Sequence, residues 1–169
     1  MCKTAKLNKW DVKPTQEYFD ELFRISDKQI VWGANNFNLP NTEYFIIWDK
    51  EQTVENFASA EYAWTNIKMP AKVFRYSIHK VISDRKSEQG KIHPTQKPIA
   101  LYEWLLKNYA KQGDKILDTH VGSASSLIAC YNLGFDYMGF ELDEDYFKAA
   151  CKRIEARKNQ MDIFHMEEQ

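Results

Sequence analysis

The C-terminal half of the chain alternates short apolar strands with helices, and this alternation restricts the fold more than any other feature. Strands are predicted at Lys115–Asp118 and Tyr137–Phe140, and helices at about Pro98–Ala110, Ser123–Asn132 and Asp143–Arg157. Such alternation produces parallel strands joined by right-handed crossover helices. We therefore expect an α/β fold with a parallel sheet in this half.

The N-terminal half has a different pattern. A helix is predicted after Pro14, where the apolar residues of TQEYFDELFRIS lie on one face. Strands rich in β-branched and aromatic residues are predicted after it, at Gln29–Trp32, Tyr44–Trp48, Tyr62–Trp64 and Lys72–Tyr76. Residues 79–97 are the most polar stretch, with five basic and two acidic side chains, a net charge of +3. No apolar period is present between Ser83 and Gly90, which predicts a loop.

Composition excludes several classes of protein. The 169 residues include 44% hydrophobic ones and a net charge of -1, which favour a folded domain over a disordered chain or a uniformly basic nucleic-acid binder. No run of about 18 apolar residues is present, so no membrane span is expected, and the N-terminus lacks the apolar centre of a signal peptide. Three scattered cysteines predict neither a disulfide framework nor a zinc site. We expect a soluble domain of a reducing compartment, without a metal.

A candidate binding site is encoded where the predicted strand ends at Asp118. The turn that follows contains the small residues Gly122 and Ala124 and leads directly into a helix. Ligands of parallel sheets bind at this edge, and the free N–H groups of a helix N-terminus add to it. Glu141 ends the next strand, where a carboxylate can accept hydrogen bonds from a ribose. The alternative is that both carboxylates only cap strand ends and helix starts.

The turn also restricts the kind of adenosine ligand. It has a single glycine rather than G-x-G-x-x-G, and no G-K-[ST] phosphate loop is present. An acidic residue at the strand end, Asp118, suits a cationic ligand without phosphate better than a pyrophosphate. S-adenosyl-L-methionine, which carries an ammonium and a sulfonium group, meets this requirement.

Three segments together resemble the DNA methyltransferases that modify amino groups, the adenine-N6 and cytosine-N4 enzymes. They are KIHPTQKP at Lys91–Pro98, DTHVGS at Asp118–Ser123, and Phe140–Glu141. Their order resembles the β-type, permuted arrangement of phage and prophage members. The stretch from Glu17 to Tyr76 is similar to the central part of such members.

The resemblance implies a Rossmann-like sheet with helices on both faces and S-adenosyl-L-methionine as the cofactor. By the same resemblance, Glu141 would hold the ribose and Asp118, His120 and Gly122 the methionine end, with Ala124 replacing the family's usual glycine. The full set of implied cofactor-binding residues is His93, Thr95, Gln96, Lys97, Asp118, Thr119, His120, Gly122, Ser123 and Glu141. Of these, the first four would lie against the methionine carboxylate.

The family's catalytic motif, [DNS]-P-P-[YFW], is not found in the sequence. All five prolines are isolated, at positions 14, 40, 70, 94 and 98. The family order would place this motif before Glu17, so we expect a domain that is incomplete at its N-terminus, with an unpaired strand edge beside Asp118. A gene fragment, a late translational start, a split enzyme completed by a second chain, and a degenerate binding protein all remain open, and the catalytic residues are unknown.

The expected organisation is one methyltransferase-like domain. It comprises a partial catalytic and target half (1–78), a polar loop (79–92), a cofactor-binding half (93–158) and a tail (159–169). Contacts with double-stranded DNA are predicted in and near the polar loop, against the alternative of a solvated loop, at Arg75, Lys80, Arg85 and Lys86.

Three functions are compatible with these patterns. The first is a DNA methyltransferase, favoured for adenine, in the cytoplasm of a bacterial or phage-infected cell. The second is a catalytically inactive cofactor- or DNA-binding module, or one subunit of a split enzyme. The third, a small-molecule methyltransferase, is disfavoured by the His93–Pro98 motif.

Overall fold

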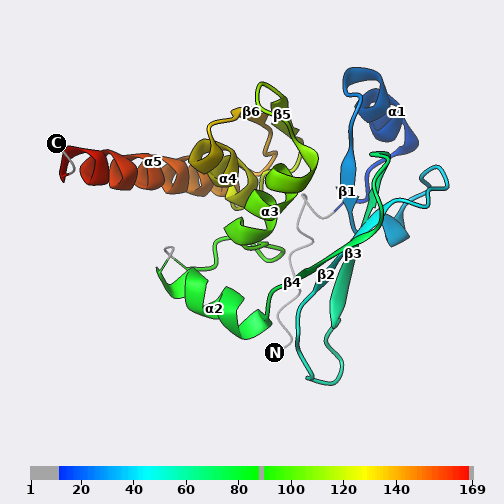
Figure 1. The fold of residues 1–169 in the computed structure, drawn as a ribbon, viewed down its shortest axis with the longest axis horizontal. Helices are drawn as coiled ribbons and strands as arrows, with labels where there is room; N and C mark the ends of the chain where they lie inside the picture. Colours follow the sequence, from blue (N-terminus) through cyan, green and yellow to red (C-terminus); the bar gives the residue numbers. More distant parts are fainter. Residues whose placement is uncertain (1–11, 88–89, 168–169) are drawn as a thin grey trace, which may run out of the picture. The chain divides into compact units, whose positions relative to one another are not determined.

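The computed structural model describes residues 12–87 and 90–167, with the side chains of 85–87 and 161–167 outside the description. The chain divides into two compact units, Met1–Ile78 and His79–Gln169. Each unit combines helices with a sheet of its own (Figure 1). The units are called unit 1 and unit 2 below, and each is described by itself.

Unit 1 is built on a four-stranded mixed sheet in the order β1-β3-β2-β4. Strand β3 pairs antiparallel with β1 and β2, and β4 pairs parallel with β2. All four predicted strands are present, and their ends differ from the predicted ones by at most two residues. The elements of unit 1 are α1 (Gln16–Ile25), β1 (Ile30–Trp32), η1 (Ala34–Asn36), β2 (Phe45–Asp49), β3 (Ala60–Thr65) and β4 (Lys72–Arg75).

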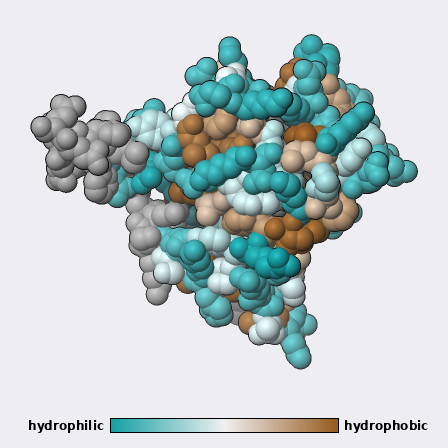
Figure 2. All heavy atoms as spheres, in the orientation of Figure 1, coloured by the Kyte–Doolittle hydropathy of each residue, from teal (hydrophilic) through white to brown (hydrophobic). Residues whose placement is uncertain are grey.

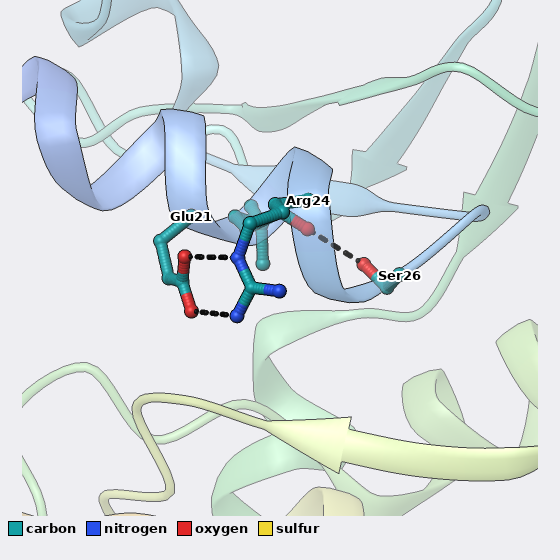
Figure 3. A network of polar contacts seen from close by, with 4 residues as sticks. Glu21, Arg24 and Ser26 are labelled. Atoms are coloured by element: carbon teal, nitrogen blue, oxygen red, sulfur yellow. Dashed lines mark hydrogen bonds and ion pairs between the residues drawn. The ribbon is translucent and has the colours of Figure 1, made fainter.

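Alternation along β2 positions the core of unit 1. Ile46 and Trp48 are buried, whereas Phe45 on the opposite face is 36% exposed. Helix α1 buries Phe19 and has its charged residues on the solvent side. There Arg24 donates two hydrogen bonds to the Glu21 carboxylate in a fork-like pair (Figure 3). This pair holds the pKa of Glu21 below its ordinary value, but its exposure makes its contribution to stability small.

Helix α2 (Ile78–Ser87) occupies most of the segment that the sequence predicted to be a loop. The prediction of a loop from Ser83 to Gly90 is therefore wrong as far as Ser87. The physical reason is tertiary: Val81 is only 1% exposed, and burial of such a residue stabilises a helix whose own apolar pattern is weak.

Unit 2 contains the predicted parallel strand pair with its crossover helix. Strands β5 and β6 are parallel, with Lys115 opposite Asp136 and Asp118 opposite Gly139. Within the described residues, β6 is the one strand that pairs with β5. This strand–helix–strand unit is typical of the Rossmann-like α/β fold that the sequence predicted. The elements of unit 2 after α2 are α3 (Ile99–Tyr109), β5 (Lys115–Asp118), α4 (Ser125–Leu133), β6 (Asp136–Gly139) and α5 (Glu144–Glu167).

Two boundaries in unit 2 differ from the predicted ones by two residues or more. Helix α4 begins at Ser125 rather than Ser123, because residues 123 and 124 still belong to the turn. Helix α5 continues past the predicted end at Arg157 as far as Glu167, so most of the predicted tail is helical.

Helix α4 is the central element of unit 2. It packs against α3, α5 and both strands. Its buried residues Leu127, Ala129 and Cys130 contact Ile116 and Tyr137 on one face of the strand pair. On the other face, Leu117 and Met138 are 39% and 61% exposed. This packing fixes the start of α4, and hence the turn before it, relative to the strand ends.

Large apolar side chains are exposed at several further positions, Leu142 and Phe57 among them. Figure 2 shows brown apolar areas between hydrophilic ones on the visible face. In the part of the chain that the structure describes, no helix has both the length and the apolar character needed to cross a bilayer.

Candidate functional site

The turn between β5 and α4 is held by the Asp118 carboxylate. Oδ1 accepts a hydrogen bond from the backbone N–H of His120 at 2.9 Å, and Oδ2 accepts one from the Ser126 hydroxyl. The first contact fixes the turn directly after the strand, and the second ties it to the first turn of α4. Asp118 therefore has the structural role that the sequence left open, and its contact with a ligand stays a prediction.

Two residues of this turn adopt left-handed backbone conformations. Gly122 has a φ of 52°, and a Cβ atom there would lie 3.3 Å from the His93 ring. Ala124 has a φ of 61° and is fully buried at the N-cap of α4. A left-handed conformation costs an alanine about 1–2 kcal/mol, so the surrounding contacts must hold this residue in place. The turn is thus a strained segment that approaches the neighbouring His93 closely.

The Glu141 carboxylate connects this turn to the start of α5. One oxygen accepts the Gly122 N–H at 2.8 Å, and the other accepts the Asp143 N–H at 3.0 Å. The Asp143 carboxylate in turn caps α5 by accepting the N–H groups of Asp145 and Tyr146. Glu141 and Asp143 thus fix the geometry of the strand end and of the helix that follows.

The His93 motif lies against the same turn. His93 is 9% exposed, and its ring centroid is 4.4 Å from that of Tyr146 in an edge-to-face arrangement. Its Nδ1 accepts the backbone N–H of Thr95 at 3.3 Å and lies 3.0 Å from the Thr95 hydroxyl oxygen. Gln96 bonds back to the start of the motif, since its side-chain oxygen accepts the N–H of Ile92 at 3.0 Å. The structure therefore brings together His93, Gly122 and Glu141, which are far apart in the sequence.

Burial lowers the pKa of His93 below its ordinary value of 6.5, although the negative charge of Glu141 opposes this shift. The folded protein therefore holds His93 neutral at pH values where the unfolded chain binds a proton. Because the unfolded state takes up more protons at this residue, the contribution of His93 to the free energy of unfolding falls as the pH drops below 6.5.

A His93→Gln variant tests this pH dependence. We expect the stability difference between the parent and the variant to be constant above pH 7 and to shrink as the pH falls from 6.5 towards 5, since glutamine does not titrate. Urea unfolding at several pH values measures it. A difference that is independent of pH across this range would contradict the assignment.

The remaining predicted cofactor residues differ in exposure. The hydroxyl oxygen of Thr119 lies 3.1 Å from Nδ1 of the exposed His120. Ser123 is buried, with its hydroxyl 3.1 Å from that of Ser125. Thr95 is exposed and Lys97 is half-buried.

The predicted DNA contacts belong to another part of the chain. Arg75 ends β4, and its Nε lies 3.5 Å from the Asp49 carboxylate, with both side chains substantially exposed. Lys80 is exposed on α2, where Arg85 and Lys86 also lie, although the side chains of the latter two are outside the description. Contact with DNA by these residues stays a prediction.

Three other features of the chain concern possible sites elsewhere: metal ligands, a buried thiol and a hollow in unit 1. Among the described residues, no group of three or more His, Cys, Asp or Glu side chains is arranged to hold a metal ion. Burial, with a contribution from the charge of Asp118, raises the pKa of Cys130 to about 12, so this thiol is no nucleophile at neutral pH. An open hollow of about 320 Å³ in unit 1, between residues such as Phe23, Tyr44 and Trp64, contains none of the predicted site residues.

Three residues that shape the site were missed by the sequence interpretation. Tyr146 packs on His93, Gly139 accommodates Val121, and Arg153 donates to the turn. A glycine within a strand is a sign of close approach by a neighbour, so Gly139 carried a readable signal. Arg153 lies near Ala150 and Ile154 on the apolar side of α5, where a charge calls for a buried partner.

Comparison with known proteins identifies a family that matches most of the chain. The family model described as DNA methylase matches residues 3–152. The type II methyltransferase M.HpaI of Haemophilus parainfluenzae is 33% identical over 142 residues, 83% of this chain and 39% of that protein. The type II methyltransferase M2.DpnII of Streptococcus pneumoniae is 31% identical over 134 residues, 79% of this chain and 44% of that protein.

A solved structure, the M1.HpyAVI–SAM complex, is similar with a TM-score of 0.49 and 26% identity, covering 64% of this chain and 60% of that one. The chain spans less than half the length of the two type II methyltransferases. The family match nevertheless extends over most of its residues and includes the His93, Asp118 and Glu141 segments. This chain belongs to the DNA methylase family, the methyltransferases of adenine N6 and cytosine N4.

Proposed function

We propose that this chain binds S-adenosyl-L-methionine and forms the cofactor-binding part of a DNA methyltransferase that modifies an exocyclic amino group, with adenine N6 as the favoured target. The observation that supports this most strongly is that His93, Gly122 and Glu141 lie together beside the carboxyl ends of β5 and β6. Family membership supplies the class of reaction. The proposed setting is the cytoplasm of a bacterial or phage-infected cell.

The residues at this edge fit the proposed cofactor. Each oxygen of Glu141 accepts one backbone N–H and keeps further acceptor capacity, so the carboxylate can also accept from the two ribose hydroxyls. Gly122 has no side chain, which lets the His93 motif lie directly against this turn. The carboxylate of Asp118 supplies the negative charge that suits an ammonium or sulfonium group.

The structure refines the roles proposed for the His93 motif. The His93 ring and the Gln96 side chain are buried and bonded within the motif, so we assign them to holding its shape. Thr95 and Lys97 are more accessible and are the proposed partners of the methionine carboxylate. Bound at this site, the cofactor would supply the methyl group.

The catalytic step needs groups that we do not place in these residues. The target base must leave the DNA stack, and its weakly nucleophilic amino group must donate its protons to acceptors as methyl transfer begins. Since the five prolines are all isolated, the sequence offers no Pro-Pro motif for this purpose. We propose that another segment or a second chain supplies the motif and a strand beside β5. Double-stranded DNA would be the substrate, with Arg75, Lys80, Arg85 and Lys86 as the proposed phosphate contacts.

Calorimetric titration with S-adenosyl-L-methionine tests the cofactor site. We expect the parent chain to bind and a Glu141→Ala variant to bind about 10–100-fold more weakly, because charge-assisted hydrogen bonds contribute about 1.5–3 kcal/mol. Glu144→Ala is the matched control, since Glu144 is an exposed residue of α5 whose carboxylate pairs with Lys148. A parent chain that shows no binding at millimolar cofactor would refute the proposal.

Transfer of a labelled methyl group to unmethylated double-stranded DNA separates the enzyme from its alternative. Transfer by the chain alone would identify a complete enzyme. Binding of cofactor without transfer would support the cofactor-binding module or split-enzyme subunit, and recovery of transfer on adding a second chain would identify the subunit.

A further inference from the structure

Arg153, in the middle of α5, is a buried charged residue to which the proposed function assigns no role. Only 4% of it is accessible, and arginine is rarely buried to this extent unless it is bonded to specific partners. Removing a guanidinium from water carries a cost that hydrogen bonds must offset. The position of these bonds therefore shows which part of the structure depends on Arg153.

Two hydrogen bonds of Arg153 lead to the turn between β5 and α4. Its Nη1 donates to the carbonyl oxygen of Ser123 at 2.7 Å and to the hydroxyl of Ser125 at 2.9 Å. The Ser125 hydroxyl lies 3.1 Å from that of Ser123. A single nitrogen thus bridges both neighbours of Ala124, the residue with the strained left-handed conformation.

This turn is anchored on its other side as well. Glu141 binds the N–H of Gly122, and Asp118 binds Ser126 at the start of α4. These two carboxylates belong to the ends of β5 and β6 and bond to the turn from there, whereas Arg153 bonds to it from α5. A strained backbone persists only when its surroundings determine it from several directions.

We propose that Arg153 is a positioning residue for the cofactor, which holds the Gly122–Ser126 turn in the conformation that binds S-adenosyl-L-methionine. It acts through Ser123 and Ser125. This inference rests on the proposed function, because it assumes that the turn contacts the cofactor. Removing the residues that orient the ligands of a metal site typically costs about 10–100-fold in affinity or activity, and we expect an effect of this size here.

Arg157 offers a matched control on the same helix. It lies one turn further along α5, and its Nε donates to the side-chain oxygen of Asn132 at 2.9 Å, near the C-terminal end of α4. Both arginines therefore connect α5 to α4 or its preceding turn, but only Arg153 reaches the turn. Both substitutions remove a hydrogen bond that connects α5 to the α4 region. Only Arg153→Met also removes the hydrogen bonds to the turn.

The test compares Arg153→Met, Arg153→Lys and Arg157→Met in the full chain. Calorimetry gives the dissociation constant for S-adenosyl-L-methionine, urea unfolding gives the stability, and hydrogen exchange of the peptide containing residues 118–126 reports the turn without cofactor. We expect Arg153→Met to bind the cofactor about 10–100-fold more weakly and to exchange faster in this peptide. Arg153→Lys, which keeps a donor, should recover part of the affinity, and Arg157→Met should stay within twofold of the parent.

The outcomes are distinguishable. If the parent does not bind the cofactor, the proposed function fails. In that case, faster exchange in Arg153→Met but not in Arg157→Met would still support the inference that Arg153 fixes the turn. If the parent binds and Arg153→Met matches it within twofold in affinity and in exchange, the positioning role is refuted. Should Arg153→Met not fold, Ser125→Ala replaces it, because this change removes one partner of Arg153 and leaves the charge in place. Ser125→Ala with the affinity and exchange of the parent would then refute the role.

Discussion

Replacement of Gly139 by alanine is expected to lower the free energy of unfolding by about 1–3 kcal/mol, the typical cost of overfilling a packed core. A Cβ atom on Gly139 would lie 2.4 Å from Cγ2 of Val121 and 3.0 Å from Cδ1 of Leu127. Val121 has few alternative rotamers, and it belongs to the turn that contains Gly122. The new methyl group must therefore displace the turn, so we also expect weaker cofactor binding. Urea unfolding and calorimetry measure the two effects.

Two further variants make this experiment specific. Gly113→Ala introduces the same methyl group where no atom lies within 4 Å, so any stability that it loses comes from its left-handed φ of 90° and not from crowding. The double variant Gly139→Ala with Val121→Ala removes the closest contact and should recover part of the stability. A Gly139→Ala protein as stable as the parent would show that the end of β6 is less tightly packed than the structure indicates.

Replacement of Asp118 by alanine is the second large effect that we expect. It removes the acceptor for the His120 N–H and for the Ser126 hydroxyl together. Hydrogen bonds to a charged group contribute about 1.5–3 kcal/mol each, and partial exposure of Asp118 reduces this, so we expect a loss of about 2 kcal/mol. Cofactor binding should weaken by about 10–100-fold, as the turn loses its anchor to β5.

A graded series separates the two contacts of Asp118. Ser126→Ala removes one hydrogen bond and keeps the carboxylate, so it should lose less stability and retain most of the affinity. Asp118→Asn keeps a single acceptor oxygen and should fall between the parent and alanine in both properties. Equal stability and affinity in all four proteins would mean that the Asp118 side chain neither fixes the turn nor contacts the cofactor.

The elements of the fold could be predicted from the sequence because their signals are local. The strand at Lys115–Asp118 and the helix after it were expected from apolar periodicity, and the structure confirms both within two residues. Helix α2 instead depends on a contact that is not local in the sequence. Its sequence lacks a clear apolar period, and burial of Val81, which no local pattern reveals, accompanies the helix.

The sequence by itself determined the family motifs and the kinds of residue at the site: a carboxylate at each of two strand ends, a glycine in the turn, and a histidine motif upstream. Only the tertiary structure decided how they act together. His93 lies against Gly122, Glu141 binds the same glycine, and Arg153 reaches the turn from α5. The reason is physical, since periodicity and turn chemistry concern neighbours in the chain, whereas these contacts join residues 19 to 30 positions apart. Such contacts form only when the packing of α4 on β5 and β6 brings the segments together.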